Sequence, residues 1–159
     1  MTLLNIFVAV AARVLLVALF LPFSALDKIL NFKQAAGQAA EAIPERSLAT
    51  LMIIGGLGVE IVMSLAILTG MADRMAALIL AAYCIVTAIV WKPFWRQPDF
   101  RLQGSSRGRE TFWDFLKNLA LAGGFLVLAF GATATGLQRF LAHPLASSHP
   151  YAVADQRDT

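Results

Sequence analysis

Residues 112–131 read FWDFLKNLALAGGFLVLAFG, an apolar stretch of the length, about 20 residues, that a helix needs to cross a bilayer. Lys117 and Asn118 lie inside this stretch, and Gly123 and Gly124 follow one turn or two later. A charge in lipid is costly, so such a residue usually faces the interior of a helix bundle and meets a partner there. The stretch therefore predicts a membrane helix with a polar inner face.

The composition of the whole chain agrees with a membrane protein. Of its 159 residues, 58% are hydrophobic and 14% are charged, whereas an average soluble domain has about 25% charged residues. No basic stripe suggests a nucleic-acid partner. The single cysteine, Cys84, excludes an intrachain disulfide or a cysteine-held metal site, and both histidines lie near the C-terminus. We therefore expect no metal site and no haem in the bundle.

Four long apolar segments cover residues 3–29, 48–69, 75–91 and 112–133. They predict an all-α fold, a polytopic membrane protein with a bundle of four transmembrane helices. Residues 1–135 form this domain, and a polar, loosely ordered tail follows at 136–159. We interpret the first segment as an uncleaved helix, because an arginine interrupts it and further spans follow. The alanine-rich connection at 31–47 permits a short interfacial helix.

The distribution of cations predicts the orientation of the chain. Four spans place both termini on one side and the connections 31–47 and 92–111 on the other. The two connections hold seven cations, and the opposite side holds three. By the positive-inside rule, the connections face the cytoplasm and both termini face outward.

Two charges inside the first two spans lie at similar predicted depths. With a rise of about 1.5 Å per residue, Arg13 lies roughly 22 Å and Glu60 roughly 18 Å from the basic side of the membrane. The charges are opposite, so we predict an ion pair between Arg13 and Glu60. On the second span, Gly56, Glu60 and Ser64 recur at every fourth residue and form a seam of small and polar side chains that permits close helix packing.

A second pairing is predicted nearer the basic side. Asp27 and Lys28 close the first span there, and Lys117 lies just inside the fourth. Lys117 can pair either with Asp27 or with Asp114 on its own helix at i, i+3. At 100° per residue, one face of the first span carries four polar residues: Arg13, Ser24, Asp27 and Asn31.

Several stretches together resemble the DoxX family. They are RVLLVALFLPFSALDKILNF from residue 13, GGLGVEIVMSLAILTG around Glu60, KPFW after the third span and FLKNLALAGGFLVLA from residue 115. The resemblance implies a four-helix protein of the bacterial inner membrane, similar to the small membrane subunit of thiosulfate:quinone oxidoreductase. The polar interior residues that it implies as a ligand site or polar core are Arg13, Asp27, Lys28, Glu60, Lys117 and Asn118.

Three functions are compatible with these features. The first is a membrane subunit that binds a quinone and serves a redox partner protein, with Lys117 and Asn118 as hydrogen-bond donors to a carbonyl oxygen. The second is a structural or assembly scaffold whose buried pairs only orient helices. The third is a small transporter for protons or anions, which with four helices requires a homo-oligomer. The chain contains no self-contained catalytic constellation, so at most it is a subunit of a quinone-linked oxidoreductase.

Overall fold

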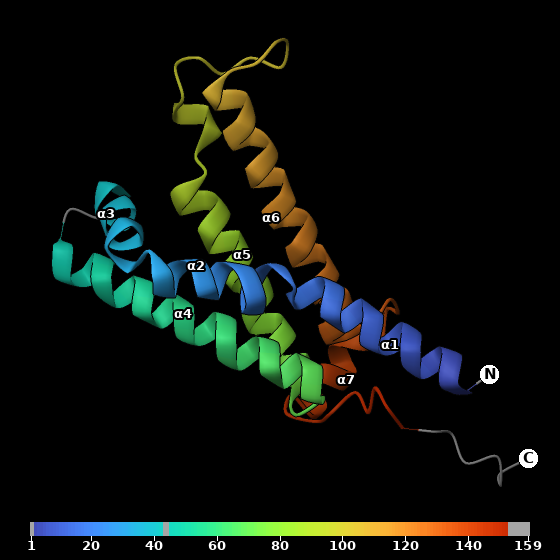
Figure 1. Cartoon of the computed structure of the whole chain (residues 1–159). Coiled ribbons are helices and arrows are strands. Elements are labelled where there is room, and N and C mark those ends of the chain that lie inside the picture. Colours follow the sequence, from blue (N-terminus) through green and yellow to red (C-terminus); the bar gives the residue numbers. More distant parts are fainter. Residues whose placement is uncertain (1, 43–44, 153–159) are drawn as a thin grey trace, which may run out of the picture.

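A computed structural model describes residues 2–42 and 45–152 of the chain. Four helical segments in it are long and apolar enough to cross a membrane: Leu3–Leu30, Arg46–Thr69, Asp73–Arg96 and Arg107–Phe130. Every regular element among the described residues is helical (Figure 1). The predicted all-α bundle of four membrane helices is confirmed.

The first span is not one regular helix. α1 covers Thr2–Val17, a π-helical turn covers Leu19–Ser24, and α2 covers Ala25–Leu30. Pro22 lies within the π-helical turn. Proline has no N–H and its ring disturbs the preceding helical turn, which explains why the irregularity occurs at this place.

The π-helical turn changes which residues face the interior. The N–H of Ala25 donates to the carbonyl of Phe20, five residues earlier instead of four. This extra residue rotates the rest of the span by about 100° relative to a regular helix. As a result Lys28 is largely covered and Asp27 is exposed. The predicted common face of the first span is therefore wrong at Asp27 and Asn31, which are exposed, whereas Ser24 still points inward.

The connection after the first span forms a helix, as its alanines predicted. α3 covers Phe32–Ala42 and packs along α4, which covers Arg46–Thr69. Ala39 on α3 and Ala49 on α4 are both buried. Because α3 accompanies the beginning of α4, that beginning projects past the end of the first span. Residues 43–44 of the connection lie outside the described residues.

α5 (Asp73–Trp91) and α6 (Arg107–Phe130) form the most extensive helix contact and run antiparallel. A short 3-10 turn, Phe94–Arg96, begins their connection. Phe20 of the first span packs on Phe125 of α6, with their ring centroids 5.7 Å apart. The resulting core draws on all four spans, through Val17, Phe20, Ile67, Leu80, Ala81, Phe125 and Ala129.

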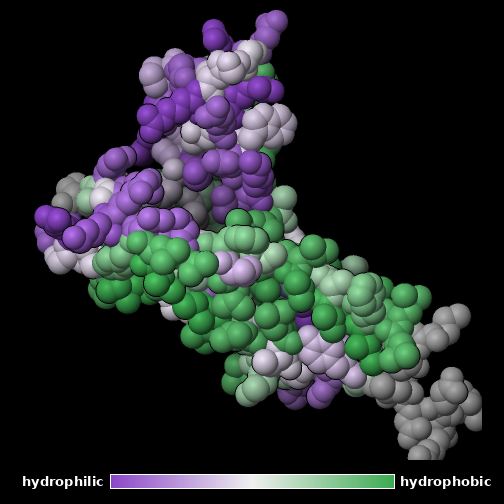
Figure 2. Space-filling model, in the orientation of Figure 1, coloured by the Kyte–Doolittle hydropathy of each residue, from purple (hydrophilic) through white to green (hydrophobic). Residues whose placement is uncertain are grey.

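The two halves of the bundle run in different directions. In Figure 1, the first span and α4 lie side by side, while α5 and α6 cross behind them and continue upward to the connection at 97–106. Figure 2 shows hydrophobic residues over the first span and α4, and hydrophilic residues over α3 and the far end of α5 and α6. The apolar surface is what a helix bundle in lipid presents.

The C-terminal segment folds back onto the bundle. α7 covers Gly136–Ala142, and the ring of Phe140 lies 5.2 Å from that of Phe130 on α6. Further on, the hydroxyl of Tyr151 donates to the carbonyl of Leu68, at 2.5 Å. The division of the chain at residue 135 and the loose order of the tail stay predictions, but residues 136–152 contact the ends of α4 and α6.

Candidate functional site

Two buried ionic clusters lie between the spans. The first, here called the Glu60 cluster, consists of Ser24, Lys28, Glu60 and Tyr83. The Oε1 atom of Glu60 accepts hydrogen bonds from Lys28 Nζ at 2.5 Å, Tyr83 OH at 2.8 Å and Ser24 Oγ at 3.1 Å. Three elements supply these donors, namely α2, α5 and the π-helical turn. The cluster thus joins the first span to α4 and α5.

The other carboxylate oxygen of Glu60 is different. Glu60 is only 2% exposed, and its Oε2 atom has no hydrogen-bond partner among the described residues. Ser64, one turn further on the same face of α4, also has a buried hydroxyl without a partner there. A buried polar atom left unsatisfied costs about 1–3 kcal/mol, so such atoms usually meet a water or a ligand. Glu60 therefore presents one saturated and one free oxygen.

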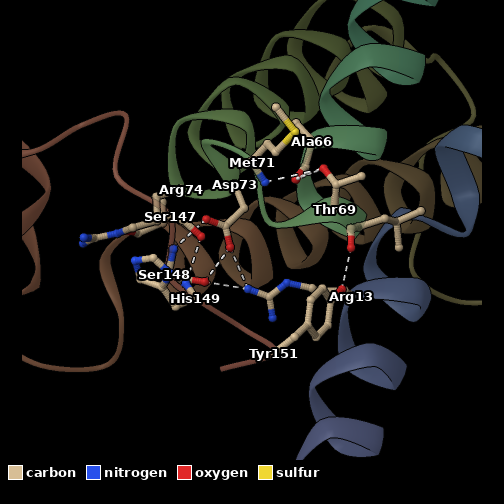
Figure 3. Close-up of polar contacts among 12 residues, drawn as sticks. Arg13, Ala66, Thr69, Met71, Asp73, Arg74, Ser147, Ser148, His149 and Tyr151 are labelled. Carbon is tan, nitrogen blue, oxygen red and sulfur yellow. Dashed lines mark hydrogen bonds and ion pairs between the residues drawn. The ribbon is translucent and has the colours of Figure 1, made fainter. Parts of the chain in front are cut away.

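The second cluster, here called the Asp73 cluster, consists of Arg13, Asp73 and Ser148 (Figure 3). Arg13 donates to Asp73 Oδ2 at 2.7 Å and to Ser148 Oγ at 2.7 Å. Ser148 donates its N–H to Asp73 Oδ1 at 2.9 Å and its hydroxyl to Oδ2 at 2.5 Å. Asp73 is fully buried, and both of its carboxylate oxygens are hydrogen-bonded. The ring of Tyr151 lies beside the guanidinium, 6.0 Å from its carbon.

The predicted pair between Arg13 and Glu60 is wrong. Arg13 pairs with Asp73, and Glu60 pairs with Lys28. The depth estimate assumed that α4 begins level with the end of the first span, but α4 projects past it alongside α3. Lys28 thus lies opposite Glu60, and Arg13, fifteen residues earlier, lies opposite a residue thirteen positions after Glu60. At 1.5 Å per residue the two clusters are roughly 20 Å apart.

Of the two alternative partners predicted for Lys117 near the basic side, the structure contains one. Lys117 pairs with Asp114 at 3.2 Å, which confirms one of its two predicted partners. Asp27 instead accepts a hydrogen bond from Asn31 on the protein surface, so the alternative pair of Asp27 with Lys117 is absent from the described structure. Asn118 donates to the carbonyl of Asp114. The side chain of Lys117 is 71% exposed, and a site at Lys117 and Asn118 remains a prediction.

Two glycines mark close approaches between helices. A Cβ atom on Gly56 would lie 3.1 Å from the hydroxyl oxygen of Tyr83, so the small-residue seam of α4 packs on α5 beside Glu60. A Cβ atom on Gly124 would lie 2.9 Å from a methyl of Leu16, where α6 meets α1. Gly123 faces open space, so only the second glycine of the pair serves the predicted close packing.

Four residues of the clusters were not among the predicted site residues, although one of them, Ser24, was on the predicted polar face of the first span. Tyr83 lies in the third span, where a hydroxyl amid apolar residues is itself a signal for an internal partner. Asp73 is the first residue of α5, where an acid can interact with the helix N-terminus or face inward between the spans. Ser148 carries no local signal, because its position depends on how the C-terminal segment folds back.

The fold and the clusters together define a multi-pass membrane protein whose buried charges are paired between spans. The family model for DoxX matches residues 8–93, which is more than half of the chain. The protein belongs to the DoxX family. The match covers both members of the Lys28–Glu60 pair and of the Arg13–Asp73 pair. No curated protein and no solved structure matches the chain.

Proposed function

We propose that this DoxX-family protein is a quinone-binding membrane subunit of a redox system and that the Glu60 cluster is its binding site. The proposal moves the site from Lys117 and Asn118 to the interior. Its support is the combination of a buried, unpartnered acceptor with donors from separate helices, because ligand sites concentrate a few placed polar groups in apolar surroundings.

The free hydrogen-bonding capacity of the cluster suits both redox forms of a quinone. Lys28 has three N–H groups, and two of them are used, for Ser24 and Glu60. The third can donate to a quinone carbonyl oxygen, and Glu60 Oε2 can accept from a hydroquinone hydroxyl. The side chain of Lys28 is 18% exposed, so the cluster is not fully enclosed at this residue.

We further propose a partner protein and a location for the chain. No sequence motif for haem, flavin or a metal centre is present, so a redox partner protein supplies or receives the electrons. We place the protein in the bacterial inner membrane, with residues 31–47 and 92–111 in the cytoplasm. The charge bias of these connections supports this orientation.

Quinone binding to the purified protein in lipid nanodiscs tests the proposal, with a short-chain ubiquinone as the probe. Tyr83→Phe removes one donor of the Glu60 cluster and leaves the Lys28–Glu60 pair in place, and we expect about tenfold weaker binding, or about 1.4 kcal/mol. Lys117→Met is the control and should bind as the unmodified protein does. The reverse order of effects would favour the site at Lys117 and Asn118, and absence of binding to the unmodified protein would reject the proposal.

The Asp73 cluster favours a second function, that of a structural scaffold. Both oxygens of Asp73 are occupied, and the partners come from α1 and the C-terminal segment. A pair whose carboxylate oxygens are both hydrogen-bonded can fix helix register without binding a ligand, although the buried Nε of Arg13 has no partner among the described residues. A scaffold would tolerate loss of the free Glu60 oxygen without any change in its assembly. The transport hypothesis stays a prediction.

A further inference from the structure

A cleft opens between α3 and the first turns of α4, away from both ionic clusters. Lys33 on α3 and Arg46 and Thr50 on α4 line it, together with Phe32 and Gly37. Lys33 follows the first span, which ends at Leu30, and Arg46 is the first residue of the second span. The cleft therefore lies at the membrane surface, at the end of the bundle where the sequence concentrates its cations.

The two cations of the cleft have no acidic partner among the described residues. Neither Lys33 nor Arg46 forms a salt bridge with any acidic side chain in the part of the chain that the structure describes. Both residues are exposed. Cations next to a membrane attract anionic headgroups with about 1 kcal/mol each, and basic pockets between transmembrane helices bind such headgroups. The positive charge of the cleft therefore favours the binding of an anion.

The remaining lining of the cleft is apolar. Phe32 and the small residues Ala36, Gly37 and Ala40 contribute it. The hydroxyl of Thr50 is already used, since it donates to the carbonyl of Arg46. A Cβ atom added at Gly37 would meet nothing within 4 Å, so the cleft is open at this point. An occupant must combine an anionic group with an apolar part.

We propose that this cleft binds one phospholipid with an anionic headgroup. The phosphate lies between Lys33 and Arg46, and the glycerol and the beginning of an acyl chain cover Phe32 and the small residues of α3. The lipid then joins α3 to α4 at the membrane surface. This site is separate from the Glu60 cluster and does not depend on quinone binding.

Retention of lipids by the detergent-purified protein, measured by native mass spectrometry, tests the site. The probes are phosphatidylglycerol, phosphatidylcholine with the same acyl chains, and inorganic phosphate. We expect the protein to retain one phosphatidylglycerol in preference to phosphatidylcholine. The double variant Lys33→Met/Arg46→Met should lower this retention at least fivefold. The matched control Arg101→Met/Arg107→Met, which removes two cations from the other connection, should not.

A second variant tests the cleft without changing any charge. Gly37→Leu fills it and, because Gly37 lies in a helix, leaves the backbone undisturbed. We expect it to lower phosphatidylglycerol retention as much as the double variant does. Gly55→Leu, at another helical glycine with open space around it, is the control. Equal retention in Gly37→Leu and Gly55→Leu, equal loss in both double variants, or displacement of the lipid by inorganic phosphate alone would each overturn the proposal.

Discussion

Both ionic clusters consist of a buried carboxylate paired with a cation, but they differ in how many of the carboxylate oxygens are hydrogen-bonded. In the Asp73 cluster, an arginine and a serine occupy both oxygens of a fully buried carboxylate. In the Glu60 cluster, three donors converge on one oxygen and leave the other without a partner among the described residues. The difference teaches that a buried ion pair by itself does not indicate a ligand site. The feature we assign to a ligand is the unpartnered carboxylate oxygen of Glu60, whereas in the Asp73 cluster it is a nitrogen, Arg13 Nε, that has no partner among the described residues.

Their positions support this distinction. The Asp73 cluster includes Ser148 of the C-terminal segment, which is held further by the bond of Tyr151 to Leu68. It therefore closes one end of the bundle. The Glu60 cluster lies where the first span, α4 and α5 meet, and its lysine is partly accessible. We infer that the first cluster serves the fold and the second serves a ligand.

The largest effect on stability is expected from Asp73→Asn. This change leaves the guanidinium of Arg13 buried without a neutralising charge, and loss of one member of a buried pair costs about 3–5 kcal/mol. Unfolding in mixed micelles of mild detergent and dodecyl sulfate measures the change. Asp114→Asn is the matched control, because that carboxylate is 40% exposed and its pairs contribute about 0–1 kcal/mol each. Equal losses in the two variants would contradict the structural role of the Asp73 cluster.

A smaller effect on stability, with a large effect on binding, is expected from Gly56→Leu. The new side chain meets the hydroxyl of Tyr83 and moves it away from Glu60, at an overpacking cost of about 1–3 kcal/mol. Quinone affinity should fall by tenfold or more. Gly55→Leu points into open space and should change neither quantity. If both variants bind quinone normally, the site lies away from Tyr83.

The smallest effects should separate the clusters most clearly. Ser148→Ala removes the hydroxyl bonds of the Asp73 cluster but keeps the backbone bond to Asp73, so stability should fall by about 1 kcal/mol. Ser24→Ala removes one bond to Glu60 of similar strength. Thermal unfolding and quinone titration of both variants provide the comparison. Only Ser24→Ala should alter quinone affinity, and an equal effect of Ser148→Ala would mean that the clusters share one function.

The spans and the presence of internal ion pairs could be predicted from the sequence. Apolar segments of sufficient length specify membrane helices, and lipid forces their charges to pair. The partners could not be predicted, since they depend on how far each helix projects. α4 projects past the first span alongside the helix Phe32–Ala42, so Arg13 and Glu60 do not lie at the same depth.

The prediction of the inward face of the first span was wrong for a different reason. Because of the π-helical turn at Pro22, Lys28 and not Asp27 points into the bundle. The periodicity of the sequence could not show this, because it assumes a regular helix. The role of Ser148 depends on a contact across 75 residues of sequence. Local patterns carry no information about a contact of that range.

Glu60 is expected to contact a ligand, while Asp73 is expected only to support the fold. Titration of a short-chain ubiquinone into nanodiscs containing Glu60→Gln or Asp73→Asn compares the two acids directly. We expect at least tenfold weaker binding for Glu60→Gln, and unmodified affinity in the folded fraction of Asp73→Asn. Unchanged affinity in Glu60→Gln, or a loss confined to folded Asp73→Asn, would contradict the account.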